Sequence, residues 1–194
     1  MRALPILLLL LLAPAQAMAV DTPTAYIRNN IDAVLAILNA PELRGEEHSD
    51  ERLRRIETVV DRFFDSEELS KRALGQYWRT FDEGQRQEFQ VLFVELIKDV
   101  YLKKSLTYNN EVVNYIQEIL KSETMAEVHT TITSPNLNIP IIYFLIRKDA
   151  SWKVYDVSVE NVSLVKNYRS QFQSILQQKS PADLIAILKE KTNE

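Results

Sequence analysis

Acid–base and metal chemistry most often use histidine, and this chain has only two, His48 and His129. His48 follows the acidic pair Glu46-Glu47 in a polar stretch, and His129 alternates with threonines in a β-branched stretch. A zinc site needs several ligands at set spacings, and neither histidine belongs to such a group. We therefore predict no metal site and interpret both histidines as ordinary residues of the surface or of a strand edge.

A set of residues for nucleophilic catalysis can be chosen on paper, namely Ser163, His129 and Asp156. None of the three lies in a local pattern that activates a nucleophile, and the G-x-S-x-G turn of serine hydrolases is absent from the sequence. Any chain of this size contains such sets by chance. The sequence therefore predicts no catalytic residue.

The composition excludes several other classes of function. Three glycines are too few for the clustered-glycine loops that hold dinucleotides or nucleotide phosphates. The absence of cysteine excludes disulfides, thiol catalysis and a lipid-modified N-terminal cysteine. A formal charge of −4 gives no general attraction to nucleic acids or anionic membranes. We expect no cofactor and no nucleic-acid partner.

Charged clusters along the chain are interpreted as solvated helix faces. The paired carboxylates Glu67-Glu68 stand where a helix is predicted to begin, and the helix dipole favours negative charge there. Two short basic clusters occur, at Arg52, Arg54 and Arg55 and at Lys103-Lys104. Docking to a partner is the alternative for the basic clusters.

The first nineteen residues have the parts of a secretory signal peptide. Arg2 supplies a positive charge, residues 6–12 are an unbroken apolar run, and Ala17 and Ala19 fit small-residue cleavage sites. The apolar run is too short to serve as a membrane anchor. We predict cleavage after Ala19, with Ala17 as the alternative, which leaves residues 20–194 as one soluble domain in the periplasm.

Hydrophobic periodicity predicts helices at both ends of the mature chain and strands between them. Helical patterns occupy 24–40, 50–64, 65–75, 82–106, 164–178 and 181–191. Alternating β-branched and aromatic residues predict strands at 112–120, 125–134, 139–147 and 151–160. The short connections make these strands antiparallel. The predicted fold class is α+β, with N-terminal helices and a long helix packed on a four-stranded sheet, followed by C-terminal helices.

Two apolar patterns bear on where a filled core or the wall of a cavity lies. An aromatic stripe runs into and along the long helix, at Tyr77, Trp78, Phe81, Phe89, Phe93 and Tyr101. For the aromatic stripe, periodicity alone does not separate a core from a cavity wall. The segment 139–147 is apolar on both faces, with Ile142, Phe144 and Ile146 on one and Ile141, Tyr143 and Leu145 on the other, which predicts a strand that is covered on both sides.

Three groups of short motifs occur in a particular order and spacing. They are LGQYWR at 74–79 with QRQEF at 85–89 and 93–101; WKVYDV at 152–157 with VSLV at 162–165; and NYRSQF at 167–172 with 175–176 and 183–189. Together they resemble the MlaC family, also called the toluene-tolerance auxiliary family, over nearly the whole mature chain. One departure is Asn161, where the family usually has glycine, although asparagine also tolerates unusual backbone angles.

The resemblance implies a periplasmic phospholipid carrier that is not an enzyme. It implies a monomer that moves lipid between an outer-membrane lipoprotein–porin complex and an inner-membrane ABC transporter with an MCE-domain subunit. The implied fold is a cone of helices against a curved antiparallel sheet, similar to nuclear-transport-factor-like folds. The alternatives are a hopanoid-associated lipid-binding relative, a periplasmic adaptor with a filled core and a lipid-modifying enzyme.

Lipid tails are expected between the long helix and the sheet. The candidate wall residues are Trp78, Phe81, Phe93, Ile97, Tyr101, Ile142, Phe144, Ile146, Val157 and Val159. The headgroup is expected in water at the mouth, where Tyr168 and Arg169 are candidate phosphate contacts. An ion pair between Arg169 and Asp156 is the structural alternative for Arg169.

Overall fold

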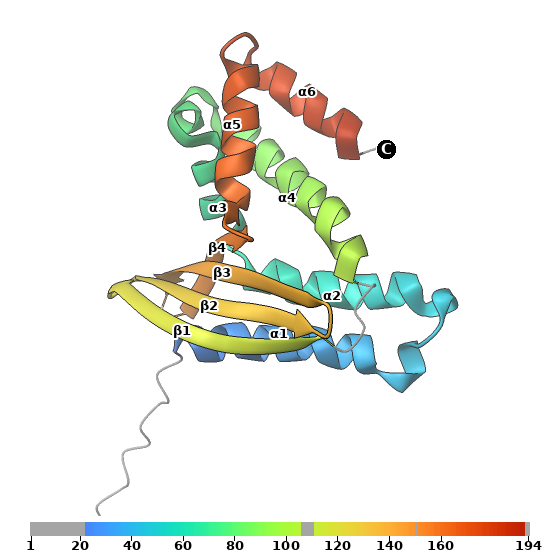
Figure 1. The fold of residues 1–194 in the computed structure, drawn as a ribbon. Helices are drawn as coiled ribbons and strands as arrows, with labels where there is room; N and C mark the ends of the chain where they lie inside the picture. The colour runs from blue at the N-terminus through green and yellow to red at the C-terminus, as the bar shows by residue number, and fades with distance from the viewer. Residues whose placement is uncertain (1–21, 106–110, 150, 193–194) are drawn as a thin grey trace, which may run out of the picture.

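The structure is a computed structural model that describes residues 22–105, 111–149 and 151–192 (Figure 1). The predicted signal peptide at 1–19 lies outside the described residues. The helices are α1 (Pro23–Asn39), α2 (Ser49–Phe63), α3 (Ser66–Leu74), α4 (Glu83–Ser105), α5 (Leu164–Leu176) and α6 (Pro181–Thr192). The strands are β1 (Val112–Ser122), β2 (Met125–Ser134), β3 (Leu137–Lys148), β4 (Ser151–Val159) and β5 (Val162–Ser163). Short 3₁₀ helices lie at Pro41–Leu43, Glu46–His48 and Gly75–Thr80.

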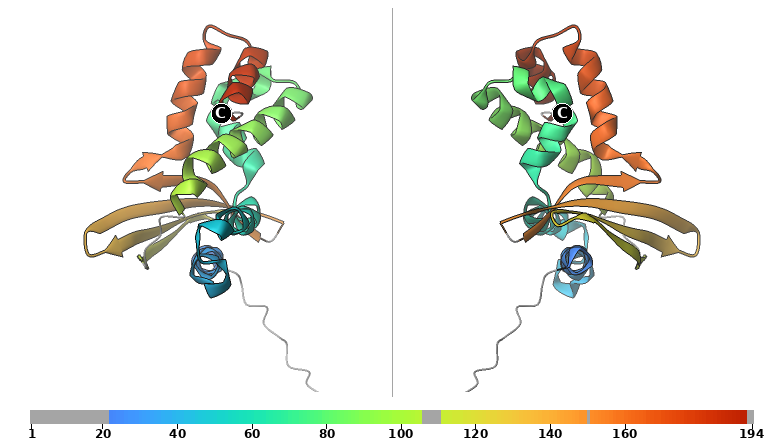
Figure 2. Two further views of the ribbon diagram at one scale, coloured as in Figure 1. Left: turned by 90° about the vertical axis from the view of Figure 1, so that its right-hand side faces the viewer. Right: turned by 90° about the vertical axis from the view of Figure 1, so that its left-hand side faces the viewer.

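The strands form one antiparallel sheet in the order β1-β2-β3-β4-β5. In the view of Figure 1, α1 and α2 run behind the sheet, and α3 to α6 form a helical lobe above them; the side views of Figure 2 show the lobe above the sheet and α1 below it. The α+β prediction is confirmed, with a fifth strand of two residues where four strands were predicted. The turn into β5 has positive φ at Glu160 and Asn161, of 50° and 68°, which asparagine tolerates well.

One face of the sheet, here called the inner face, packs against α1 and α2. Tyr26 of α1 stacks on Phe63 of α2 with ring centroids 5.9 Å apart, and Phe63 meets Tyr143 of β3 edge-on at 6.0 Å. Val128 and Leu145 are fully buried in the same cluster. Side chains alternate along a strand, so the neighbours of Val128, Tyr143 and Leu145 in the sequence lie on the opposite, outer face of the sheet.

The helical lobe has a separate core that is filled by aromatic rings. Phe89 and Phe93 on α4 meet Phe172 of α5 edge-on, with centroids 5.3 and 5.2 Å apart, and Phe81 meets Phe89 at 5.7 Å. Phe81, Phe89 and Phe93 are all at most 2% exposed. Edge-to-face pairs at these distances are the favoured aromatic arrangement, so this part of the molecule is close-packed.

The chain passes from α2 to α3 beside β4, where the two cores meet. The backbone N–H of Asp65 donates to the carbonyl of Val154 at 2.8 Å. The Asp65 carboxylate caps α3 by accepting from Glu68 N at 2.9 Å, and it also pairs with Lys148 Nζ at 2.7 Å. The predicted helix start at Asp65 is thereby confirmed, and the same side chain attaches α3 to the β3–β4 hairpin.

Candidate functional site: an apolar cavity

Two adjoining cavities lie between the helices and the inner face of the sheet. The larger, here called the α4 chamber, has a volume of about 810 Å³ and lies between α2, α4 and the strands β3 to β5. The smaller, the α1 chamber, has a volume of about 520 Å³ and lies between α1, α2 and the strands β1 to β3. They share six lining residues, which are Val60, Phe64, Tyr101, Ile139, Tyr143 and Val159.

The α1 chamber is built from the apolar stripes of two helices. Ile31, Val34 and Leu35 of α1 face Val59 and Val60 of α2 across it, and each set has helical spacing. The inner face of the sheet closes the chamber with Val113, Ile132, Ile139, Ile141 and Tyr143. The sequence pattern identified both helical stripes, but it did not distinguish a wall facing empty space from a packed surface.

The α4 chamber uses the C-terminal half of the long helix. Val94, Ile97 and Tyr101 are three and four residues apart, so they lie on one face of α4 and all line the chamber. Val157 and Val159 of β4 also line the chamber. Thus four of the ten predicted wall residues, Ile97, Tyr101, Val157 and Val159, line the cavity in the structure.

Two predicted wall residues lie in the filled core of the helical lobe, and a third packs against it. Phe81 and Phe93 are enclosed by other aromatic rings, and neither lines a chamber. Trp78 packs against the same cluster and lies 5.3 Å under the Arg86 guanidinium. The N-terminal part of the aromatic stripe therefore belongs to the core, and the chamber begins further along α4.

The three predicted wall residues of β3 lie on the face of the strand opposite the chambers. Tyr143 is paired with Val157 and Ile141 with Val159, and residues paired across an antiparallel ladder share a face. Ile142, Phe144 and Ile146 therefore point to the outer face, away from the chambers. The Phe144 ring instead lies 6.2 Å from Tyr155, which occupies an irregularity in the β3–β4 pairing.

The two predicted headgroup residues also lie away from the cavity. Tyr168 is 8% exposed and packs edge-on against Phe93 at 5.0 Å, and its burial raises the pKa of its hydroxyl. Arg169 Nε donates to the backbone carbonyl of Arg72 at 2.7 Å and so joins α5 to α3. Asp156 accepts instead from Ser163 Oγ at 2.6 Å and from Val165 N at 3.0 Å. The alternative pairing of Arg169 with Asp156 is therefore wrong as well.

Polar residues at the edge of the α4 chamber were not predicted. Lys98 of α4 and Asp61 of α2 both line it, and Lys98 Nζ lies 2.6 Å from Asp61 Oδ1. Glu160, in the β4–β5 turn, and Asn167 of α5 line the same chamber. The sequence signal that was missed is the position of Lys98, next to Ile97 on the predicted inner half of the long helix.

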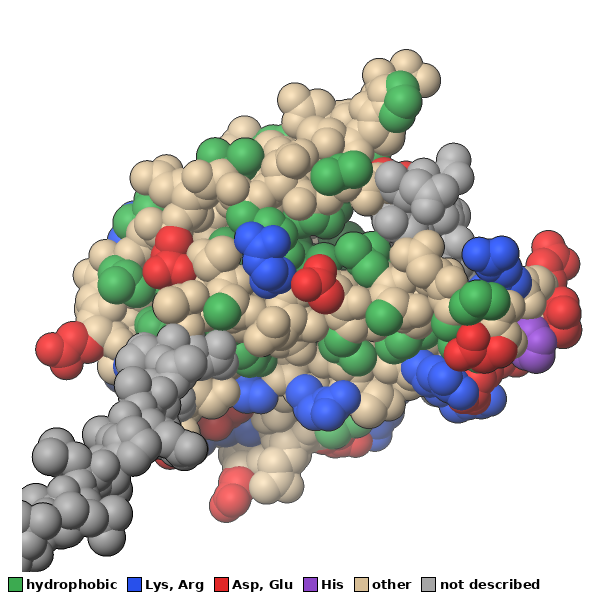
Figure 3. Space-filling view, turned by 90° about the horizontal axis from the view of Figure 1, so that it is seen from below, with side chains coloured by type: hydrophobic (Ala, Val, Ile, Leu, Met, Phe, Trp, Pro, Cys, Tyr) green, Lys and Arg blue, Asp and Glu red, His purple; other side chains and the backbone are tan. Residues whose placement is uncertain are grey.

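The edge of the cavity carries exposed apolar side chains. Tyr101, Val159 and Val162 line the α4 chamber and are 41%, 37% and 60% exposed, and Leu137 of the α1 chamber is also exposed. Residues that line a cavity and also reach solvent mark its opening. Figure 3 shows hydrophobic side chains gathered around a hollow in the lower face of the molecule.

Tyr143 is the most deeply buried ionisable group of the cavity wall. It lines both chambers, and its burial among apolar side chains raises the pKa of its hydroxyl. The phenol therefore stays neutral at any physiological pH. The deep wall presents no charge to a ligand at this point.

The residues considered for chemistry are not assembled into a reactive site. Ser163 lies in β5 and His129 in β2, so β3 and β4 separate them in the sheet. His129 Nε2 lies 3.2 Å from Glu127 Oε2 on β2 itself. In residues 22–105, 111–149 and 151–192, no three His, Asp or Glu side chains are grouped in a way that could hold a metal ion.

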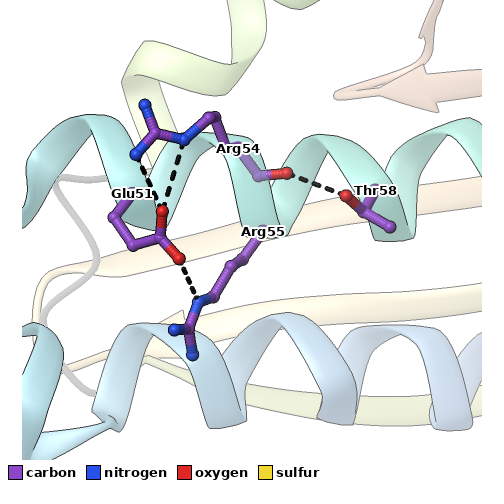
Figure 4. Close-up of polar contacts among 4 residues, drawn as sticks. All are labelled: Glu51, Arg54, Arg55 and Thr58. Atoms are coloured by element: carbon purple, nitrogen blue, oxygen red, sulfur yellow. Dashed lines mark hydrogen bonds and ion pairs between the residues drawn. The ribbon is translucent and has the colours of Figure 1, made fainter.

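The basic cluster on α2 is engaged in local ion pairs. Glu51 accepts from Arg55 Nε at 2.7 Å and from Arg54 Nη2 at 2.8 Å, as Figure 4 shows. These hydrogen bonds, first from Arg55 and then from Arg54, lower the pKa of the Glu51 carboxyl. Arg52 instead donates to the carbonyls of Leu43 and Gly45. The arrangement fits the interpretation as a solvated helix face.

The fold and cavity define a class of small α+β proteins in which helices and a curved sheet enclose an apolar chamber. The sequence model of one such family, described as "MlaC protein", matches residues 28–190. The chain therefore belongs to the MlaC family, as the sequence motifs predicted.

Similar proteins agree with this membership. The chain is 22% identical to the intermembrane phospholipid transport system binding protein MlaC of Haemophilus influenzae, over 92% of this chain and 86% of that protein. It is 24% identical to toluene tolerance protein ttg2D of Pseudomonas putida, over 89% of this chain and 81% of that protein. A phospholipid-binding protein from Ralstonia solanacearum, solved in complex with a phospholipid, has the same fold. It superposes with a TM-score of 0.76 at 24% identity, covering 87% of this chain and 96% of that one.

Among the described residues, no helix is both long enough and apolar enough to cross a bilayer.

Proposed function

We propose that this protein is a non-catalytic phospholipid carrier that holds acyl chains in the α4 and α1 chambers. The observation that carries the proposal is the pair of adjoining cavities, about 810 and 520 Å³, lined mainly by apolar side chains and bordered by exposed ones. A filled-core adaptor does not need such a space. The names of the relatives, one a phospholipid transport binding protein and one a protein solved with a phospholipid, support the same choice of ligand.

The energetics of lipid in water explain why a carrier needs this space. Burying one methylene contributes about 0.8 kcal/mol, so a lipid with roughly thirty chain carbons loses on the order of 25 kcal/mol when its chains enter water. A protein cavity that offers a similar apolar surface removes most of this barrier. No covalent step is required, and the wall residues only need to exclude water.

The proposal extends to location and partners. Residues 1–19 act as a signal peptide, and the mature protein works in the periplasm as a monomer. It exchanges phospholipid with an outer-membrane lipoprotein–porin complex and an inner-membrane ABC transporter with an MCE-domain subunit. Both partners must reach the same opening, so we expect them to bind around Tyr101, Val159 and Val162 in turn.

The first test is recovery of bound lipid. The protein is exported in a bacterial host, purified without detergent and extracted with organic solvent for mass spectrometry. We expect intact phospholipid, and protein recovered without any lipid contradicts the proposal. Lipid that is chemically converted during incubation points to the enzyme alternative, and bound hopanoid points to the hopanoid-associated relative.

A matched pair of substitutions, one on β4 and one on α4, tests where the acyl chains of the lipid lie. Val157→Trp fills part of the α4 chamber, whereas Val91→Trp adds the same bulk on an exposed position of α4. We expect Val157→Trp to lower the lipid-to-protein ratio and Val91→Trp to leave it unchanged. Equal ratios in two folded variants would show that the α4 chamber does not hold the chains.

A further inference from the structure

The open edge of the α4 chamber, here called its mouth, carries an uneven set of charges, with more anionic than cationic side chains. Lys98 is the one cation among the described residues that line either chamber. Two carboxylates, Asp61 and Glu160, line the same chamber, together with the amide side chain of Asn167. The four residues come from α2, α4, the β4–β5 turn and α5. A ligand whose chains fill the chamber therefore meets one positive and two negative groups at its polar end.

Lys98 and Asp61 already form an ion pair at the edge of the chamber. The Lys98 side chain is 18% exposed, and the Asp61 side chain is 53% exposed. Lys98 is therefore held toward the cavity, while Asp61 reaches outward into solvent. An ammonium group can bind two anionic oxygens at once because it has three donors, so Lys98 has room for a phosphate oxygen beside Asp61.

We propose that this mouth favours phospholipids with a zwitterionic headgroup, in which Lys98 binds the phosphate and Asp61 and Glu160 attract the headgroup ammonium. The inference rests on the proposed function and specifies its ligand. A headgroup such as phosphoethanolamine carries one negative and one positive group and complements the uneven set. A phosphoglycerol headgroup carries only the negative charge. It offers no ammonium group to Asp61 and Glu160, so Lys98 is the only cation near these two carboxylates among the described lining residues.

The size of the preference follows from the exposure of the mouth. The acyl chains supply the affinity, and charges at the edge supply discrimination. Ion pairs near solvent contribute modestly because water and salt screen them. We expect a preference of about two- to fivefold, which decreases as the salt concentration rises.

The experiment is a competition between two lipids that differ only in the headgroup. Purified protein is incubated with vesicles of equal parts phosphatidylethanolamine and phosphatidylglycerol with identical acyl chains, then separated and analysed by mass spectrometry. The expected result is a two- to fivefold enrichment of phosphatidylethanolamine. Equal loading, or an excess of phosphatidylglycerol, overturns the headgroup inference alone. Loading of neither lipid contradicts the proposed function itself.

Substitutions at the mouth assign the preference to individual residues. Asp61→Asn and Glu160→Gln should each shift loading toward phosphatidylglycerol by about twofold, because each removes one negative charge. Lys98→Gln should lower phospholipid loading relative to diacylglycerol, which has no phosphate. A preference unchanged in all three variants overturns the assignment.

A second ion pair provides the matched controls. Glu88 of α4 and Lys189 of α6 pair at 2.5 Å in the helical lobe, and neither lines a chamber. Glu88→Gln and Lys189→Gln make the same changes of charge away from the mouth. Both are expected to keep the preference of the original protein; a similar loss in these controls would show that net charge, rather than the mouth, sets the preference.

Discussion

The two halves of α4 have the same kind of apolar face but different surroundings. In the N-terminal half, Phe89 and Phe93 are fully buried among rings of α5. In the C-terminal half, Ile97 and Tyr101 line a chamber of about 810 Å³. A filled core uses apolar side chains to stabilise the fold, whereas the chamber leaves the same kind of surface for a guest.

The difference between the two halves of α4 allows one small domain to be both stable and hollow. The rings of the helical-lobe core, Phe89, Phe93 and Phe172, line neither chamber, whereas Phe63 of the inner-face core lines the α1 chamber. Stability is therefore concentrated where rings interlock. The side chains of the cavity walls contribute less to packing. Substitutions in the two regions should therefore affect the stability of the fold and the binding of lipid separately.

The largest effect is expected from shortening a ring in the filled core. Phe93→Ala should lower the free energy of unfolding by about 3–5 kcal/mol, because it leaves a void among three rings. Ile97→Ala, one turn further along α4, should cost about 1 kcal/mol because Ile97 already borders empty space. Denaturant unfolding of the two variants measures both values. Similar losses would show that the two halves of α4 are equally packed.

The next effect concerns the junction of the two regions. Asp156, on β4, is 7% exposed and accepts from Ser163 Oγ and Val165 N at the start of α5. Asp156→Ala should cost about 2–3 kcal/mol, because it leaves two buried donors without a partner. Denaturant unfolding of Asp156→Ala, Ser163→Ala and the double variant forms a cycle. If the two single losses simply add, the residues do not act together as this geometry requires.

A smaller effect, on lipid rather than stability, tests the choice of sheet face. Ile97→Glu places a charge in the wall of the α4 chamber, and Phe144→Glu places one on the outer face. Ile97→Glu should reduce recovered lipid roughly tenfold or more, since an unpaired carboxylate among acyl chains costs over 1.4 kcal/mol. Phe144→Glu should retain most of the lipid. Loss of lipid from Phe144→Glu alone would instead favour the outer face.

The sequence predicted the elements well because each has a clear period. The helical stripes of α1, α2 and α4 and the alternation of the strands follow from which side chains leave water. Tyr168 was also predictable as a core residue, since Val165, Tyr168, Phe172 and Leu176 recur at helical spacing and are buried together on α5. The motifs for the family were sufficient for the fold class.

The cavity wall was harder to predict because it depends on packing between distant segments. Both faces of β3 are apolar, so only pairing with β4 decides that Ile141 and Tyr143 face the chambers. The irregularity at Tyr155 changes which β4 residues share that face, and no local pattern marks it. Likewise, the filled core extends along α4 only as far as Phe93, because Phe172 of α5 packs against Phe93 there.

The smallest effect is a pH dependence of stability at the start of α6, in the helical lobe. Asp183 Oδ2 accepts from Ser180 Oγ at 2.7 Å and from Ser180 N at 2.9 Å. These hydrogen bonds, the side-chain one first, lower the pKa of the Asp183 carboxyl from its usual value of 3.8. A lowered pKa means that the contribution of the carboxylate to stability is complete above the usual pKa and is lost as the pH falls through the pKa of the folded state.

Asp183→Asn should therefore be slightly less stable than the original protein at pH 7, and the difference should disappear in strong acid. Denaturant unfolding at both pH values measures it, with Asp99→Asn at an exposed position of α4 as the control. A difference that persists in acid would assign the loss to the shape of the cap rather than to its charge.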